Sequence, residues 1–363
     1  MNESTTTTTT SQKLSSALNR LRGSDGGRWS NIAAAQKFSN ERALDLATIV
    51  GDLLPTDEGS LTVFGSLARG EFTVESDLDW AIMIDARADS RHLNLVHELR
   101  SRLKKAEFKD PGPTGVFGGL VFSHELIHAI GGDEDTNKNM TRRLLLLLES
   151  QAIGSPESAQ VRDRIIKGVL ARYVEEDANF VAANVQGKKI PRFLLNDVVR
   201  FWRTMAVDYA NKFRVRAGEK WALRNIKLRM SRKLLFVSGF LMCVSWALET
   251  PESGEQELTV QKLVSHLRDW TERQPLESLA IAVERYAPSL SDDIFGTYDQ
   301  FLSLLNDKEK REVLEELTPD QAYENRVFLD AREVAHTFDR GLLKLLFESN
   351  VDITETVKKY GIF

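Results

Sequence analysis

Apolar residues are spaced differently in the two parts of the chain, and this difference predicts its organisation. In the first part, short apolar runs such as 61–64 and 80–84 are bounded by polar or turn-forming residues, as is typical of buried strands. After Pro156, apolar residues recur at helical spacing almost throughout. We therefore expect an α+β fold, in which a small mixed-sheet domain at 12–153 is followed by an all-α helical domain at 154–363.

Turn and cap signals refine this outline in the first part. Strands are expected at 61–64, 80–84 and 116–122, and helices at 12–22, 39–53, 90–108 and 139–150. Ser39 is the predicted N-cap of the second of these helices, and Thr136 or Asn137 that of the last. Residues 1–11, which include the threonine run 5–10, have low complexity and are predicted to be disordered.

The second part is predicted to be a helical bundle or array. The expected helices span roughly 157–177, 191–214, 219–249, 258–271, 276–287, 291–305, 307–315, 318–347 and 352–359. The C-terminal third, from Pro251 onward, is acidic and carries no pattern that indicates chemistry. We expect it to pack the bundle or to bind a partner protein.

The composition is that of an ordinary globular protein, with 363 residues of which 42% are hydrophobic and 28% are charged. No apolar run approaches the ~20 residues that a membrane span needs, and the N-terminus lacks the basic-then-apolar pattern of a secretion signal. The single cysteine, Cys243, excludes an internal disulfide. These features favour a cytoplasmic protein in a reducing compartment, without membrane contact.

Charge is distributed unevenly along the chain. Residues 188–233 contain 14 Lys and Arg but three acids, a net charge of +11, whereas the whole chain carries −5 and the remainder therefore −16. Such a segment can neutralise a triphosphate, or bind a polyanion such as RNA through its phosphates. Trp202, Tyr209 and Trp221 lie within it and suit either base stacking or core packing.

One stretch, residues 61–84, combines several groups that suit phosphate chemistry. Gly65 and Ser66 follow an apolar run, and Asp77 and Asp79 precede another, which predicts a strand, a turn, a short helix and a strand. Side chains alternate along a strand, so Asp77 and Asp79 are expected on the same side. Two neighbouring carboxylates suit Mg²⁺, which commonly binds one or two of them together with substrate phosphates. A glycine lets the backbone approach a phosphate closely.

These residues resemble the signature of a known superfamily. Gly65-Ser66, Ala68-Arg69-Gly70 and Ser76-Asp77-Leu78-Asp79 are similar to the motif of the DNA polymerase β-like nucleotidyltransferases, in their minimal nucleotidyltransferase branch. The resemblance implies a nucleotidyltransferase domain at 12–153 that uses Mg²⁺ and an NTP, ATP included, to move a nucleoside monophosphate onto an acceptor hydroxyl. It further implies catalytic, metal-binding roles for Asp77 and Asp79, and nucleotide contacts for Gly65, Ser66, Arg69 and Ser76, to which we add Lys227 from the basic segment. The basic segment favours RNA, tRNA or protein over a small molecule as the acceptor.

The resemblance is incomplete in one respect. In this superfamily a third acid on a later strand often completes the metal site, but the predicted strand at 116–122 holds no acid. The nearest acids are Asp110 before it and Glu125 after it. An alternative hypothesis is therefore a catalytically weak, nucleotide-binding regulator or an antitoxin-like module.

A second motif suggests different chemistry. His124-Glu125-Leu126-Ile127-His128 matches the H-E-x-x-H pattern of zinc hydrolases, in which the histidines lie one helical turn apart. Glu149 is the nearest candidate for a third ligand. The alternative is a short helix that packs Leu126, Ile127 and Ile130 into the core, with the histidines near its ends.

Overall fold

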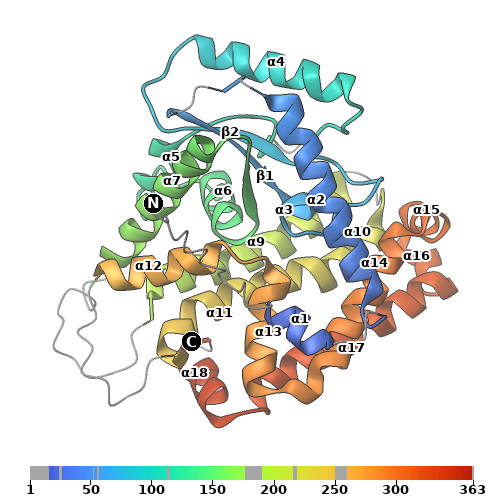
Figure 1. Cartoon of the computed structure of the whole chain (residues 1–363). Helices are drawn as coiled ribbons and strands as arrows, with labels where there is room; N and C mark the ends of the chain where they lie inside the picture. The colour runs from blue at the N-terminus through green and yellow to red at the C-terminus, as the bar shows by residue number, and fades with distance from the viewer. Residues whose placement is uncertain are drawn as a thin grey trace, which may run out of the picture.

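The computed structural model describes residues 16–23, 27–51, 53–54, 57–112, 115–175, 190–215, 219–249 and 260–361. The tail predicted to be disordered, residues 1–11, lies outside this set, as do Lys188 and Lys189 of the basic segment. Figure 1 shows a small sheet in the upper half of the molecule and a mass of helices below it.

The sheet has four strands in the order β3-β2-β1-β4. They span Gly59–Phe64 (β1), Trp80–Ile84 (β2), Gly119–Phe122 (β3) and Ser150–Ile153 (β4). β1 is antiparallel to both of its neighbours, whereas β2 is parallel to β3. This mixed sheet, followed by helices, confirms the predicted fold class. The strand β4 was not predicted, because residue 150 was assigned to the end of a helix.

The helices of the first part are α1 (Ala17–Arg22), α2 (Ser30–Val50), α3 (Gly65–Ala68), α4 (Arg91–Lys105), α5 (Ser123–Ile127) and α6 (Asn137–Leu148). Thr136 caps α6 as predicted, by accepting a hydrogen bond from the Asn139 amide. The prediction that Ser39 caps a helix was wrong, because α2 begins at Ser30 and Ser39 lies within it. There the Ser39 hydroxyl donates to the Ala35 carbonyl and accepts from the Phe72 amide at 2.9 Å.

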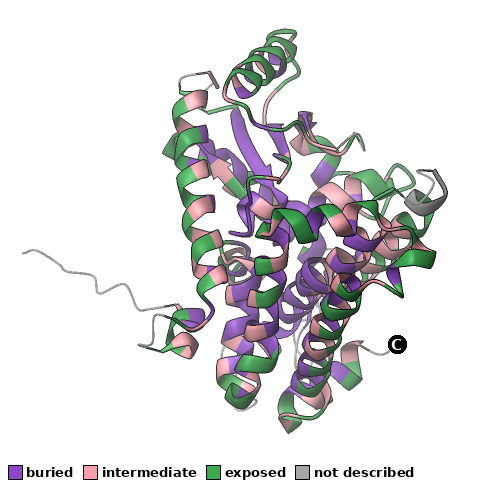
Figure 2. Ribbon diagram, turned by 90° about the vertical axis from the view of Figure 1, so that its right-hand side faces the viewer, coloured by how far each residue is buried: buried purple, intermediate pink, exposed green. Residues whose placement is uncertain are grey.

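Both faces of the sheet are buried, which explains why its strands read as continuous apolar runs. One face packs against α2 and α4 in a cluster that includes Leu46, Ile82 and Leu99. The other face adds Phe64 and Met83 to a larger core, which continues through the helical part of the chain. In Figure 2 the buried residues run without a break from the strands into the helices below.

The second part is entirely helical within the described residues, as predicted. Its elements are α7 (Pro156–Glu175), α9 (Arg192–Val215), α10 (Trp221–Lys227), the π-helical turn η1 (Leu228–Arg232), α11 (Lys233–Glu249), α12 (Val260–Thr271), α13 (Pro275–Tyr286), η2 (Pro288–Leu290), η3 (Asp292–Gly296), α14 (Thr297–Asn306), α15 (Lys308–Glu316), α16 (Pro319–Ala322), α17 (Arg326–Phe347) and α18 (Val351–Gly361).

The stretch from α10 to α11 is the most apolar helical segment. By length and composition alone, Trp221–Glu249 is long and apolar enough to cross a membrane. The apolar runs in the sequence did not predict this. However, 72% of its most apolar 18-residue stretch is buried inside the protein, as expected for the core helix of a bundle. Its neighbours in the core include α9 and α13.

The N-terminal helices connect the two parts. The backbone amides of Ala17 and Leu18 in α1 donate to Glu277 of α13. At the start of α2, the Ile32 amide donates to Asp299 of α14, while the other end of this helix reaches the sheet. Figure 1 shows α2 running beside both the sheet and the helical part. The division of the chain after residue 153 stays a prediction.

Candidate active site

The connection from β1 to α3 is shaped by Gly65. Its φ of +64° lies in the left-handed region that favours glycine. A Cβ at this position would lie 2.7 Å from the Asp79 Oδ2 atom. The chain is held there by the Phe64 amide, which donates to the Asp79 carbonyl at 2.9 Å. Gly65 is therefore required both by its backbone angle and by the carboxylate packed against it.

Asp77 and Asp79 lie in an extended segment immediately before β2, not on the strand itself. Leu78 between them is buried, whereas Asp77 is exposed and Asp79 is half-buried, so the side chains alternate as the sequence predicted. Within the part of the chain that the structure describes, neither carboxylate accepts a hydrogen bond or forms an ion pair. The pKa of Asp79 is raised to about 6, mainly by burial and also by the charges of Glu149 and Asp77, against the opposing charges of Arg232 and Arg69.

Glu149 is the acid that sequence reasoning missed at this site. It follows α6 and precedes Ser150, which pairs with Phe64 in the sheet, and it is 2% exposed. Its carboxylate forms ion pairs with Arg69 and Arg232. The predicted sources of a third acid do not reach the pair. Asp110 is exposed, Glu125 pairs with Arg142 at 3.4 Å, and neither is a main influence on the pKa of Asp79.

The helical part contributes cations to the same site. Burial lowers the pKa of Lys227 to about 8, and the charges of Arg311, Arg232 and Arg69 act in the same direction, whereas Asp77 opposes them. Lys227 immediately precedes the π-helical turn η1 and Arg232 is its last residue, and π turns occur frequently at functional sites. The two side chains therefore come from one continuous helical stretch and bring positive charge close to the acids.

Arg69 lies beneath the site in a buried network. It is 6% exposed and donates to Glu71 at 2.8 Å and to Glu149. The Tyr298 hydroxyl of α14 donates to the other Glu71 oxygen at 2.6 Å. Burial alone would lower the pKa of Arg69, but Glu71 and Glu149 raise it above its usual value. Arg69 therefore binds two carboxylates of the protein itself, and this pairing does not favour the predicted contact between Arg69 and a nucleotide.

The two predicted serines differ in their surroundings. Ser66 is half-buried in the first turn of α3, and its hydroxyl has no partner among the described residues. The Ser76 hydroxyl accepts from the Thr73 amide at 3.1 Å and lies 3.0 Å from the Thr73 hydroxyl. Ser66 is thus available to a ligand, whereas Ser76 closes the turn that leads to Asp77. Nucleotide contacts by Gly65, Ser66, Ser76 and Lys227 stay predictions.

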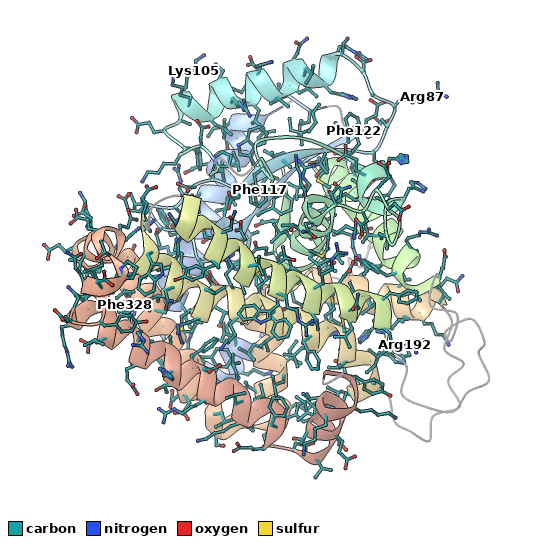
Figure 3. The ribbon with its side chains drawn as sticks, turned by 180° about the vertical axis from the view of Figure 1, so that it is seen from behind. Arg87, Lys105, Phe117, Phe122, Arg192 and Phe328 are labelled. Atoms are coloured by element: carbon teal, nitrogen blue, oxygen red, sulfur yellow. The ribbon has the colours of Figure 1, made fainter. Side chains whose placement is uncertain are left out.

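Two cations of the basic segment are neutralised by acids from later parts of the chain. Lys220 pairs with Glu315 at 2.7 Å, and Lys233 pairs with Asp339 at 2.5 Å. Two tryptophans of the segment serve packing. Trp221 packs on Phe328 with tilted rings whose centroids lie 5.5 Å apart, and Trp202 packs on Phe236. Figure 3 labels Phe328. The segment is therefore not one continuous exposed basic face.

The H-E-x-x-H motif does not form a three-ligand metal site among the described residues. The rings of His124 and His128 lie 4.8 Å apart, but Glu125 pairs with Arg142. Glu149, the suggested third ligand, belongs to the acid cluster beside Asp79. No group of three or more His, Cys, Asp or Glu side chains in the described ranges is arranged to hold a metal. Leu126 is buried, as expected for a short packing helix.

Comparison with known proteins gives a match to a protein family. Residues 45–110 match the family model described as a nucleotidyltransferase domain. No curated protein matches the chain. The matched segment includes Gly65, Ser66, Asp77 and Asp79 but covers a minor part of the chain. Residues 45–110 therefore carry a nucleotidyltransferase domain, consistent with the DNA polymerase β-like nucleotidyltransferase superfamily.

Proposed function

We propose that this protein is a Mg²⁺-dependent nucleotidyltransferase, which moves a nucleoside monophosphate from an NTP to an acceptor hydroxyl and releases pyrophosphate. The observation that carries the proposal is the pair Asp77 and Asp79, whose carboxylates have no protein partner among the described residues. Asp79 lies against Gly65, and the charge of Asp77 acts on Lys227. Gly65, Asp77 and Asp79 lie within the segment that matches a nucleotidyltransferase domain, whereas Lys227 comes from the helical part.

The donor set at the acid pair fits Mg²⁺. Asp77 and Asp79 offer hard carboxylate oxygens, and this ion commonly takes its remaining ligands from water and substrate phosphates, so two protein carboxylates suffice. We propose that both residues hold the metal and that Glu149 is the third acid of the site. When bound, Mg²⁺ neutralises negative charge on the phosphates.

The other residues act on the nucleotide and the acceptor. The Gly65 backbone and the Ser66 hydroxyl are proposed to contact the triphosphate, and Lys227 to balance its charge. In the reaction, the acceptor oxygen forms a bond to the α-phosphorus and its proton passes to solvent. The bond from the α-phosphorus to the bridging oxygen breaks, and pyrophosphate leaves with the electron pair. The protein would align the acceptor oxygen with the triphosphate and stabilise the negative charge that develops on the leaving pyrophosphate.

The acceptor is proposed to be a macromolecule, either RNA (tRNA included) or protein. Arg200 and Arg203 on α9 support this part of the proposal, because they are exposed and line a surface cavity of about 390 Å³ together with Asn137, Asn196 and Thr204. A cavity lined by arginines and amides suits an acceptor that carries phosphate or carboxylate groups. We further expect a cytoplasmic location.

Labelling by each NTP in turn tests the proposal. The protein is incubated with cell extract, Mg²⁺ and one α-³²P-labelled NTP, and the labelled macromolecule is separated. We expect one class of macromolecule to take up label, and Asp77→Asn combined with Asp79→Asn to abolish it. Asp110→Asn, which changes an exposed acid outside the cluster, is the matched control and should label normally.

A second measurement separates catalysis from regulation. Nucleotide binding by calorimetry, followed by an assay for pyrophosphate, should show both binding and release if transfer occurs. Binding without label uptake or pyrophosphate under any condition would favour the regulator hypothesis. Label uptake that persists in the double variant would contradict the proposed role of the acid pair.

A further inference from the structure

The two oxygens of the Glu149 carboxylate have very different partners. Oε2 accepts from Arg69, whose side chain is 7% exposed and is also bound to Glu71. Oε1 faces the Arg232 Nη1 atom at 3.6 Å, which is beyond hydrogen-bond distance, and the Arg232 side chain is 40% exposed. One oxygen is therefore fixed in the buried network, while the other has a loose and partly solvated counter-ion.

Arg232 also acts on the other charged groups of the site. Its charge is the strongest opposing influence on the raised pKa of Asp79, and it helps to lower the pKa of Lys227. It lies at the end of η1, five residues after Lys227. One guanidinium group thus lies within electrostatic range of Glu149, Asp79 and Lys227 at once.

We infer that Arg232 is an exchangeable counter-ion, which neutralises Glu149 in the nucleotide-free protein and turns to the phosphates when a nucleotide enters. This inference rests on the proposed function and adds a mode of regulation to the same site. A guanidinium beside Glu149 and Asp79 repels any second cation that approaches these acids. Phosphate offers it a stronger, bidentate partner. Departure of Arg232 then frees the Glu149 Oε1 atom, so that phosphate binding prepares the acids for the metal.

Arg69 and Lys227 are suited to different tasks. Removing Arg69 from Glu71 and Glu149 would leave two buried carboxylates without the cation that both of them bind, which costs too much for an exchange on each turnover. Lys227 forms no ion pair with Glu149 in the described structure, although it contributes positive charge nearby. The exchange is therefore assigned to Arg232 alone, and Lys227 supplies the matched control.

The test measures binding and requires no turnover. Mn²⁺ affinity is measured by electron paramagnetic resonance without nucleotide, and affinity for inorganic tripolyphosphate is measured by calorimetry in EDTA. For Arg232→Gln we expect Mn²⁺ to bind about fivefold more tightly and tripolyphosphate about fivefold more weakly, the ratio that corresponds to about 1 kcal/mol for a partly exposed ion pair. This opposite change is the signature of one cation shared between acids and phosphate.

A double-mutant comparison isolates the contact with Glu149. In a Glu149→Gln background, Arg232→Gln should give a clearly smaller gain in Mn²⁺ affinity, because only the effect of Arg232 on Asp79 remains. Any effect of Lys227→Gln, in contrast, should be the same with and without Glu149. Circular dichroism verifies that each variant folds. Unchanged Mn²⁺ affinity in Arg232→Gln, or a gain that is equally large without Glu149, overturns the counter-ion role and leaves the proposed function intact. Failure of the wild type to bind either probe overturns both.

Discussion

The Asp79 carboxylate occupies the space that a side chain at Gly65 would need. The Oδ2 atom lies 2.7 Å from the ideal Cβ position of Gly65, and the backbones of the two segments are joined by the hydrogen bond from Phe64 to Asp79. The turn after β1 and the acid before β2 therefore fix one another. A phosphate contact proposed for the turn and a metal contact proposed for the acid cannot be altered independently.

Gly65→Ala should disturb this relationship in a measurable way. The substitution places a Cβ against Asp79 and forces an alanine to φ +64°, so we expect a loss of about 1–3 kcal/mol in the free energy of unfolding and a loss of Mn²⁺ binding. Urea denaturation and electron paramagnetic resonance measure the two effects. Gly115→Ala is the matched control, because Gly115 has φ +69° with no atom within 4 Å of its ideal Cβ. Equal behaviour of the two variants would contradict the steric argument.

The raised pKa of Asp79 predicts that its ionised carboxylate destabilises the metal-free folded protein, to an extent that depends on pH. Its usual pKa of 3.8 rises to about 6 in the folded protein, so the folded state binds the proton more tightly than the unfolded state. Stability from this group is present below pH 3.8 and is lost as the pH rises through about 6. In EDTA, Asp79→Asn should therefore be more stable than the wild type at pH 7.5, by on the order of 1 kcal/mol.

Denaturation curves at several pH values measure this effect. The advantage of Asp79→Asn should shrink between pH 6 and pH 4, and Asp110→Asn, which alters an exposed carboxylate, should show no such trend. A constant difference between Asp79→Asn and the wild type across this range would mean that burial does not penalise the Asp79 charge.

The local motif could be predicted from sequence because its chemistry is contiguous. Gly65, Ser66, Asp77 and Asp79 are brought together by a single strand–helix–strand unit, whose pattern is visible in the apolar runs. Glu149 was missed because it follows the leucine run of α6, where helical periodicity concealed the short strand β4 that carries it to β1. The fold class could also be predicted from the sequence, because it depends on the local periodicity of apolar residues.

The pairing partners of individual charged side chains could not be predicted from the sequence in this way. Arg69 became a buried structural residue through Glu71 and through Tyr298, whose hydrogen bond to Glu71 spans 227 residues of sequence. The basic segment likewise finds Glu315 and Asp339 only in the folded chain. Pairing of this kind is set by tertiary packing, and composition alone does not reveal which cations remain open to a ligand.

Tyr298→Phe tests how much the helical part stabilises the buried network of Arg69, Glu71 and Glu149. The Tyr298 hydroxyl and the Glu71 carboxylate are both buried, so removing the donor leaves one charged oxygen without that hydrogen bond. We expect a loss of about 1–3 kcal/mol in the free energy of unfolding, measured by urea denaturation. Tyr323→Phe, at a residue that is 54% exposed, should change stability by less than about 0.5 kcal/mol. A similar small effect of Tyr298→Phe would show that the network tolerates the loss.

Lys227 should give nucleotide binding a dependence on alkaline pH. Burial and neighbouring arginines lower its pKa to about 8, so the free protein loses this positive charge as the pH rises through that value. Because a neutral amine no longer attracts phosphate, tripolyphosphate affinity should fall between pH 7 and pH 9. Lys227→Met should reduce affinity about tenfold at pH 7, the equivalent of about 1.4 kcal/mol, and should remove most of this pH dependence. Lys233→Met removes a cation that is paired with Asp339, and it should leave both affinity and pH profile unchanged. A pH profile that is identical in Lys227→Met and the wild type would assign the titration to another group and exclude Lys227 from the phosphate site.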